Sequence, residues 1–163
     1  MLLTAEQRRA LLRHPAGWIA TGFGVGLSPL APGTAGSLAA LLPWLLLREL
    51  PLPWYLLALG LAAAVGVWAC AWSVRTLRSG DPRVAVFDEF VGQWLALTPL
   101  LARRGGWLWI FAGFILFRIF DVWKPWPVSW ADRSVKGGLG VMLDDVLAGA
   151  YAACGLAALL WLL

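Results

Sequence analysis

The stretch FRIFDVWKPWPVSWADRSVKGGLGVMLDD, residues 117–145, decides how this 163-residue chain folds. It is rich in charges of both signs, and it lies between two apolar runs, LWIFAGFILF before it and VLAGAYAACGLAALLWLL after it. Charged residues next to membrane-embedded segments are costly to keep unless they pair or serve a site. The stretch therefore predicts a polar site at the boundary between two membrane helices.

The composition of the whole chain favours an integral membrane protein. Hydrophobic residues make up 61% and charged residues 13% of the chain, whereas a typical soluble domain has about 25% charged residues. Twelve tryptophans and a mean hydropathy of +0.76 point the same way. A very apolar soluble helical protein is the alternative. The net charge of +4 comes without a basic run, so membrane lipids, and no nucleic acid, are the expected partners.

The hydropathy pattern predicts a single all-α membrane-embedded domain over residues 1–163, a compact bundle of about five membrane-embedded helices. The apolar segments cover residues 37–47, 54–72, 90–102, 107–117 and 146–163. Several of these segments are shorter than about 17 residues, so tilt or local thinning of the bilayer has to accommodate them.

Two further segments precede the bundle. Residues 4–13 predict a short amphipathic helix, capped by Thr4, within an interfacial segment of residues 1–16. Residues 17–37 are apolar but interrupted by Gly and Pro, and no regular helix is expected through residues 28–33. Irregular backbone near a membrane must be buried in protein or line a wet cavity, so a re-entrant loop is expected here.

Five membrane segments would place alternate connections on alternate sides of the bilayer. Residues 1–36, 73–89 and 118–145 then share one side, with ten of the thirteen basic and eight of the nine acidic residues. The positive-inside rule makes that side cytoplasmic. A transporter would instead place charges near the midplane, often between paired broken helices. A transporter or a structural subunit with an interfacial anion or metal site is kept as the alternative function.

Acidic pairs stand at the beginnings of two predicted segments. Asp88 and Glu89 begin the third segment, and Asp144 and Asp145 begin the fifth, after the glycine-rich residues 137–140. Capping of a helix N-terminus is the simplest explanation of each pair. Two such pairs in one chain favour a shared cation. Oxygen ligands without clustered Cys or His indicate Mg²⁺, with Mn²⁺ as the alternative ion.

Charged residues at a spacing of three form a second predicted group. Arg118, Asp121 and Lys124 share one helix face before Pro125 ends the helix. An ion-pair ladder at an interface would account for this spacing. The functional interpretation is a carboxylate beside two cations that hold phosphate oxygens, Arg by its fork and Lys as a point charge.

The Gly- and Pro-rich segment carries three hydroxyl side chains that are candidates for an anion site. Ser28, Thr34 and Ser37 surround backbone amides near Pro32, at the expected beginning of a helix. Helix N-termini and successive backbone amides bind anions, so this segment is a candidate phosphate-binding nest. Close helix packing is the simpler role of the glycines in the same segment.

Three blocks together resemble the phosphatidylglycerophosphatase A family. They are GFGVGLSPLAPGTAGSLAA at residues 22–40, FDEFVGQW at residues 87–94, and FRIFDVWKPWPVSWADRSVKGGLGVMLDDVLAG at residues 117–149. The resemblance implies a multi-pass enzyme of the bacterial inner membrane, with its active site facing the cytoplasm. Such an enzyme uses Mg²⁺ to remove phosphate from phosphatidylglycerophosphate, leaving phosphatidylglycerol.

The resemblance and the charge pattern together assign roles to particular residues. The expected metal ligands are Asp88, Glu89, Asp121, Asp144 and Asp145. The expected catalytic residues are Asp88, Arg118, Asp121 and Lys124. The expected substrate-binding residues are Ser28, Thr34, Ser37, Arg118, Lys124, Arg133 and Lys136. No motif of a covalent phosphoenzyme occurs, so a metal-activated water is favoured as nucleophile over an Asp. The spaced aspartates of a lipid phosphotransferase are also missing.

Overall fold

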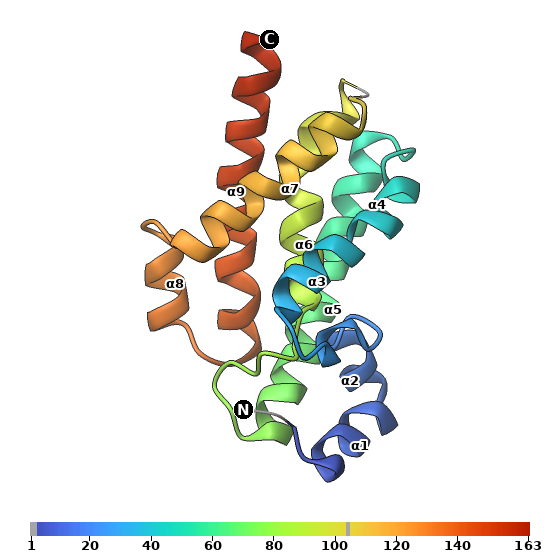
Figure 1. Cartoon of the computed structure of the whole chain (residues 1–163), viewed down its shortest axis with the longest axis vertical. Helices are drawn as coiled ribbons and strands as arrows, with labels where there is room; N and C mark the ends of the chain where they lie inside the picture. Colours follow the sequence, from blue (N-terminus) through green and yellow to red (C-terminus); the bar gives the residue numbers. More distant parts are fainter. Residues whose placement is uncertain (1–2, 104) are drawn as a thin grey trace.

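The structure, a computed structural model, describes residues 3–103 and 105–163, and all regular elements of these residues are helical (Figure 1). The predicted all-α class is therefore confirmed. Arg104, counted above among the basic residues, lies outside the described residues. In chain order the elements are α1 (Ala5–Arg13), α2 (Pro15–Ala20), η1 (Val25–Leu27), α3 (Pro32–Ala39), α4 (Leu41–Leu47), α5 (Leu52–Leu77), α6 (Phe87–Ala96), η2 (Thr98–Leu101), α7 (Trp107–Trp123), α8 (Val128–Ser134) and α9 (Gly137–Leu162).

Helix α9 is the element on which the bundle is built. It packs against α5, α6, α7 and α8, and it runs from the middle of the molecule to the C-terminal end (Figure 1). Glycines allow the closest approaches. A Cβ atom on Gly149 would collide with the backbone of Gly92 in α6, and one on Gly138 would collide with the backbone of Val67 and Ala71 in α5. Small residues at these crossings bring the helix axes close together.

Among the described residues, two helices are long and apolar enough to cross a membrane, α5 and α9. Each has 26 residues, or about 39 Å at 1.5 Å per residue, against a hydrocarbon core of about 30 Å. The expected count of about five membrane-embedded helices stays a prediction beyond these two, because α7 has 17 residues, α6 has 10 and α4 has 7. Large apolar side chains nevertheless cover the outer faces of α4, α5, α7 and α9, among them Leu46, Trp54, Leu61, Phe111 and Trp161.

The prediction that Asp144 and Asp145 begin the last helix is wrong. Helix α9 begins at Gly137, so both residues lie in its third turn. Glycine disfavours a helix interior by about 1 kcal/mol relative to Ala. Here the glycines are retained in the helix because Gly138 and Gly140 pack directly on the backbone of α5 and of Val135, where any side chain would collide. Tertiary packing outweighs local propensity at this point.

The N-terminal helix forms as expected. In α1, Thr4 Oγ1 accepts a hydrogen bond from the Gln7 backbone at 3.2 Å, and the Thr4 backbone donates to Gln7 Oε1 at 3.0 Å, so the predicted cap is confirmed. The segment of residues 17–37 is more helical than expected, with α2, η1 and α3 inside it. Its irregular parts are the turn of residues 21–24, where Gly22, Phe23 and Gly24 have positive φ, and residues 28–31, where Ala31 has a φ of 43° before Pro32 begins α3.

A buried hydrogen-bond network joins α4, α5 and α6 in the apolar half of the molecule. Trp44 Nε1 donates to Tyr55 Oη at 3.2 Å, and Tyr55 Oη donates to the Trp94 carbonyl at 2.5 Å. Trp94 Nε1 in turn donates to the Ala40 carbonyl at 2.8 Å. Buried Tyr and Trp side chains need partners for their polar atoms, and this network provides them. It holds α6, and therefore Asp88 and Glu89 at its N-terminal end, against α3–α5.

Candidate active site

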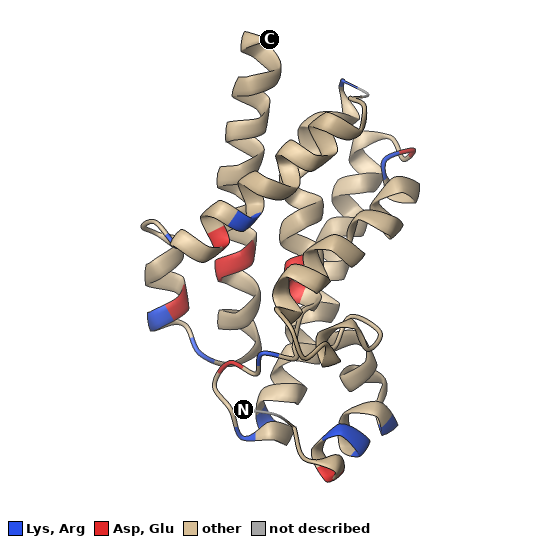
Figure 2. Cartoon of the chain, in the orientation of Figure 1, with Lys and Arg blue, Asp and Glu red and all other residues tan. Residues whose placement is uncertain are grey.

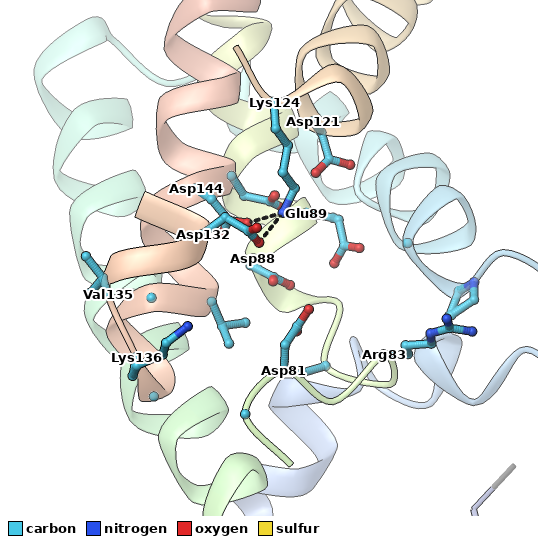
Figure 3. A pocket seen from close by; sticks show the side chains of 18 of the residues that line it. Asp81, Arg83, Asp88, Glu89, Asp121, Lys124, Asp132, Val135, Lys136 and Asp144 are labelled. Carbon is cyan, nitrogen blue, oxygen red and sulfur yellow. Dashed lines mark hydrogen bonds and ion pairs between the residues drawn. The ribbon is translucent and has the colours of Figure 1, made fainter. Parts of the chain in front are cut away.

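A polar pocket of about 580 Å³ lies where α3, α6, α7, α8 and α9 meet (Figure 3). Figure 2 shows that charged residues are concentrated in the half of the molecule that holds the N-terminus and are sparse in the half that holds the C-terminus. The pocket walls include seven carboxylates, those of Asp81, Asp88, Glu89, Asp121, Asp132, Asp144 and Asp145. The basic residues on its walls are Arg83, Lys124 and Lys136.

Three of these carboxylates converge closely. One oxygen each of Asp88, Glu89 and Asp145 lies within 4.8 Å of the other two. Asp88 and Glu89 lie in the first turn of α6, as expected from the sequence. Asp145 joins them from α9 because Gly92 allows α6 to approach closely: a Cβ atom there would meet the Asp145 carbonyl at 2.7 Å. The exposed fractions of Asp88 and Asp145 are only 7% and 4%.

The oxygens of this group are not satisfied within the described part of the chain. Asp88 Oδ1, Glu89 Oε2 and Asp145 Oδ2 are buried and have no hydrogen-bond partner there. Buried charges of one sign are strongly unfavourable unless they are paired or coordinate a metal. Hard oxygen donors at this spacing suit Mg²⁺ or Mn²⁺. The three residues therefore fit the divalent ion that the sequence pattern suggested.

Lys124 lies between two other carboxylates. Its Nζ is 2.5 Å from Asp132 Oδ1 and 2.7 Å from Asp144 Oδ2. Burial alone lowers the pKa of Lys124, but the hydrogen bonds to Asp132 and Asp144 outweigh it and raise the pKa above its ordinary value. The expectation that Lys124 continues one face with Arg118 and Asp121 is wrong. Helix α7 ends at Trp123, and Lys124 has a φ of 48°, which turns the chain toward α8.

Arg118 is held by two partners. Its Nη1 is 2.6 Å from Asp121 Oδ2, which confirms the predicted pairing at a spacing of three, and it donates to Ser37 Oγ at 3.3 Å. Ser37 Oγ donates to the Gly33 carbonyl at 2.9 Å. A Cβ atom on Gly33 would collide with Glu89 Oε1 and would lie 3.5 Å from Arg118 Nη1. The N-terminus of α3 therefore closes one side of the pocket through a backbone that has no room for a side chain.

The five predicted metal ligands all line the pocket, in two different settings. Asp88, Glu89 and Asp145 form the close group, whereas Asp121 is paired with Arg118 and Asp144 with Lys124. Asp144 Oδ1 is a further buried oxygen without a partner in the described residues.

Several predicted substrate-binding residues lie away from the pocket. Ser28 Oγ donates to the Leu30 carbonyl at 2.9 Å, and Arg133 Nε donates to the Ser129 carbonyl at 3.0 Å. Thr34, Ser37 and Arg118 are also absent from the pocket walls, although Arg118 was predicted as a catalytic residue as well. Arg118 is joined to the site by its ion pair with Asp121, and Ser37 by the hydrogen bond it accepts from Arg118. Within the described residues, it is the backbone at Ala31–Gly33 that borders the pocket rather than these hydroxyls. Lys136 does line it.

Three lining residues were missed as site residues by sequence reasoning, Asp81, Arg83 and Asp132. Asp81 and Arg83 belong to the polar connection between α5 and α6, and Asp132 lies within residues 117–145. The signal available in the sequence was that these three residues are charged in a mostly apolar chain. Their distance in sequence from the acidic pairs concealed their place in the pocket.

Comparisons with known proteins agree with this picture. The model of the family described as phosphatidylglycerophosphatase A matches residues 18–160. A protein of Escherichia coli (strain K12) named phosphatidylglycerophosphatase A is 44% identical over 145 residues, which cover 89% of this chain and 83% of that protein. A protein of the same name from Haemophilus influenzae is 38% identical over 146 residues, covering 89% and 88%.

A third relative carries a different name. A protein of Bacteroides thetaiotaomicron named "Putative phosphatidylinositol-3-phosphatase" is 45% identical over 153 residues, covering 89% of this chain and 93% of that protein. No solved structure shows a significant match. Because the family model covers most of the chain and the two relatives of that name align over 83% and 88% of their length, this chain belongs to the phosphatidylglycerophosphatase A family, as its three sequence blocks predicted.

Proposed function

We propose that this chain hydrolyses the phosphomonoester of phosphatidylglycerophosphate, giving phosphatidylglycerol and inorganic phosphate in phospholipid biosynthesis. Family membership supports the reaction and the substrate. The observation that carries the proposal is the buried group of Asp88, Glu89 and Asp145, whose unpartnered oxygens lie in one pocket with a lysine. A phosphomonoesterase needs this combination of hard ligands and cations around a dianionic group.

In this proposal Asp88, Glu89 and Asp145 hold Mg²⁺, with Mn²⁺ as the alternative. A bound divalent ion lowers the pKa of a coordinated water and polarises the phosphoryl group. Asp121 and Asp144, each paired with a cation, support the site by holding Arg118 and Lys124 in place. A carboxylate that is ion-paired with a basic side chain fixes the direction of that side chain before the substrate binds.

Lys124 is the residue best placed to receive the phosphate. A lysine ammonium has three N–H donors, and two of them are directed to Asp132 and Asp144. The third remains for a phosphate oxygen. Its raised pKa keeps the ammonium charged, so Lys124 acts by electrostatic stabilisation of the phosphoryl charge rather than by giving up its proton.

The proposed reaction is the hydrolysis of a phosphomonoester. The oxygen of a water molecule bonds to phosphorus, and the bond between phosphorus and the terminal glycerol oxygen breaks. That oxygen leaves with a proton as the free hydroxyl of phosphatidylglycerol, and the phosphoryl group leaves as inorganic phosphate. Attack by water is preferred over attack by an Asp, since the three closest carboxylates serve as metal ligands in this proposal.

The proposed location is the bacterial inner membrane, in a multi-pass arrangement with the pocket at the cytoplasmic interface. The concentration of charge around the pocket supports this orientation through the positive-inside rule (Figure 2). Asp145 is followed by the 17 residues 146–162 of α9, or about 25 Å of helix. The carboxylates would then lie near headgroup depth, where a lipid reaches them while its acyl chains stay in the bilayer.

The Bacteroides relative favours one second candidate, a phosphoinositide phosphomonoester. Both lipids carry a phosphomonoester on a polar headgroup that a phosphodiester joins to diacylglycerol. The two candidates therefore require the same chemistry at phosphorus and differ in the headgroup between the two phosphates.

The purified chain in nonionic detergent tests the proposal. It is expected to release inorganic phosphate from phosphatidylglycerophosphate with Mg²⁺, to stop in EDTA, and to recover when Mg²⁺ is added back. Phosphatidylinositol 3-phosphate in a parallel assay decides between the two substrates, and mass spectrometry of the lipid product excludes a phosphotransferase. Ion or anion flux in proteoliposomes without phosphate release would instead support the transporter alternative.

A further inference from the structure

A second cavity lies next to the carboxylate pocket and shares part of its wall. It has a volume of about 260 Å³. Pro29, Pro32 and Arg83 line both cavities. The remaining wall of the smaller cavity is formed by Leu3, Arg8, Gly26, Leu27, Ser28 and Val84. Residues from α1, from the segment around η1 and from the loop before α6 therefore meet around one small space.

Arg8 and Arg83 have no hydrogen bond or ion pair to any described residue through their side chains, unlike Arg118 and Lys124. Figure 3 shows that the Arg83 side chain points away from the carboxylates of Asp81 and Asp88. Both arginines are exposed and line the same cavity, so an anion that enters it can be reached by both guanidinium groups. Their planar donor groups suit a phosphate.

We propose that this smaller cavity, the Arg8–Arg83 subsite, binds the phosphodiester of the lipid substrate while the phosphomonoester occupies the carboxylate pocket. The inference rests on the proposed function, because it assigns the second anionic group of that substrate. Phosphatidylglycerophosphate has two phosphates joined by a three-carbon glycerol unit. The terminal phosphate is cleaved, and the phosphodiester stays on the product.

The residues that line the two cavities indicate which phosphate of the lipid binds in which cavity. Among the described residues, the walls of the Arg8–Arg83 subsite carry no carboxylate, so they offer only cations to a group that carries a single negative charge. Its Leu3, Leu27 and Val84 suit the glycerol end of a lipid. Leu30, on the adjoining loop, is 81% exposed and extends this apolar surface outward. The acyl chains can then leave the subsite toward the bilayer without crossing the charged pocket.

Arg83 is therefore a specificity-determining residue. It stands at the wall common to both cavities, so a lipid engages both sites only when a headgroup separates its monoester from a diester. A lipid whose only phosphate is attached directly to diacylglycerol cannot fill the two together.

The first test compares three single variants in nonionic detergent micelles that contain phosphatidylglycerophosphate, Mg²⁺ and no other phospholipid. In Arg83→Gln the KM, as mole fraction of substrate, should rise about tenfold with kcat within about twofold, because a charge-assisted contact common to the ground and transition states is lost. Arg8→Gln should raise KM by a smaller factor. Arg75→Gln is the matched control, since Arg75 is exposed on α5 and lines neither cavity.

The second test uses ligands that carry one phosphate each. Phosphatidylglycerol keeps only the diester and should inhibit the wild-type chain competitively, and Arg83→Gln should weaken that inhibition about tenfold. Inhibition by inorganic phosphate, which probes the carboxylate pocket, should weaken much less in Arg83→Gln, because the Arg83 side chain points away from the carboxylates of that pocket (Figure 3). Arg83→Lys should lie between wild type and Arg83→Gln, and thermal unfolding of each variant verifies that it is folded.

Equal inhibition by phosphatidylglycerol in wild type and Arg83→Gln would overturn the subsite while leaving the proposed function standing. Equal weakening of both inhibitors would also overturn it, because the effect would then come from the carboxylate pocket. Absence of phosphate release by the wild-type chain would overturn the proposed function itself, and the subsite with it.

Discussion

Two buried polar regions of this molecule differ in whether the chain itself satisfies them. In the network of Trp44, Tyr55 and Trp94, the indole and phenol groups hydrogen-bond to one another or to backbone carbonyls. In the carboxylate pocket, buried oxygens of Asp88, Glu89, Asp144 and Asp145 have no partner among the described residues. Gln93, one turn beyond Glu89, is fully buried with both amide atoms in the same condition.

This difference indicates that the hydrogen-bond network stabilises the fold, whereas the carboxylate pocket is a binding site. An unsatisfied buried polar group costs about 1–3 kcal/mol, and more when it is charged. The Trp44–Tyr55–Trp94 network avoids this cost, whereas the carboxylates of the pocket bear it within the described residues. A region that is incomplete within the chain is completed by something bound, which in the proposed function is a divalent ion and a phosphate.

The largest effect should come from removing two of the proposed metal ligands. In Asp88→Asn with Asp145→Asn, phosphate release should fall by about 10³-fold or more, because the proposed ion would lose two of its three ligands. Thermal stability without metal should stay the same or rise, since buried repulsion is relieved. Added Mg²⁺ raises the melting temperature of wild type by mass action and should no longer do so in the variant. A clear loss of thermal stability of this variant in metal-free buffer would contradict the view that the buried carboxylates of the pocket repel one another when no metal is bound.

Removal of the lysine in the pocket should have the next largest effect. Lys124→Gln should lower kcat about 10²-fold through loss of electrostatic stabilisation, measured as phosphate release at saturating substrate. Because the folded-state pKa of Lys124 is raised, its pairing contributes stability below the unfolded-state pKa of about 10.4 and is lost only above it. The difference in melting temperature between wild type and Lys124→Gln should therefore be constant from about pH 7 to 10. A steady decline across that range would contradict this account of the pair.

Substitution of a glycine that borders the pocket should have a smaller effect on activity, and a second glycine substitution serves as its control. Gly33→Ala puts a methyl group against Glu89 Oε1 and should reduce activity about tenfold by displacing a proposed metal ligand. Gly60→Ala on α5 is the matched control, because a Cβ atom there would meet no atom of the described residues within 4 Å. The control should keep full activity and gain up to about 1 kcal/mol of stability. Equal activity of the two variants in the phosphate-release assay would exclude the proposed contact.

The smallest effect on catalysis should come from the satisfied network. Tyr55→Phe removes the hydroxyl that accepts from Trp44 and donates to the Trp94 carbonyl. It should cost about 1–3 kcal/mol of stability, because buried partners lose their hydrogen bonds, and kcat should change by less than about twofold. Thermal unfolding and phosphate release, measured on the same preparation, separate the two quantities. A large loss of activity in a folded variant would show that the two regions are coupled.

The amino-acid sequence by itself determined the local features of this protein. Composition predicted an all-α membrane protein, and short spacings predicted the Thr4 cap, the acidic pair at the beginning of α6 and the pairing of Arg118 with Asp121. The cap, the acidic pair and the ion pair each depend on residues at most three positions apart, where local helix geometry decides which side chains are neighbours. The three sequence blocks also identified the family.

Only the tertiary structure decided which distant charges meet. Asp145 joins Asp88 and Glu89, and Lys124 turns to Asp132 and Asp144. The partners in each group come from different helices, and close crossings of backbones bring them together. Gly138 and Gly140 read in the sequence as loop residues, because their local preference opposes a helix. Gly92 and Gly149 fall inside predicted helical segments, but only the tertiary structure shows that their backbones meet.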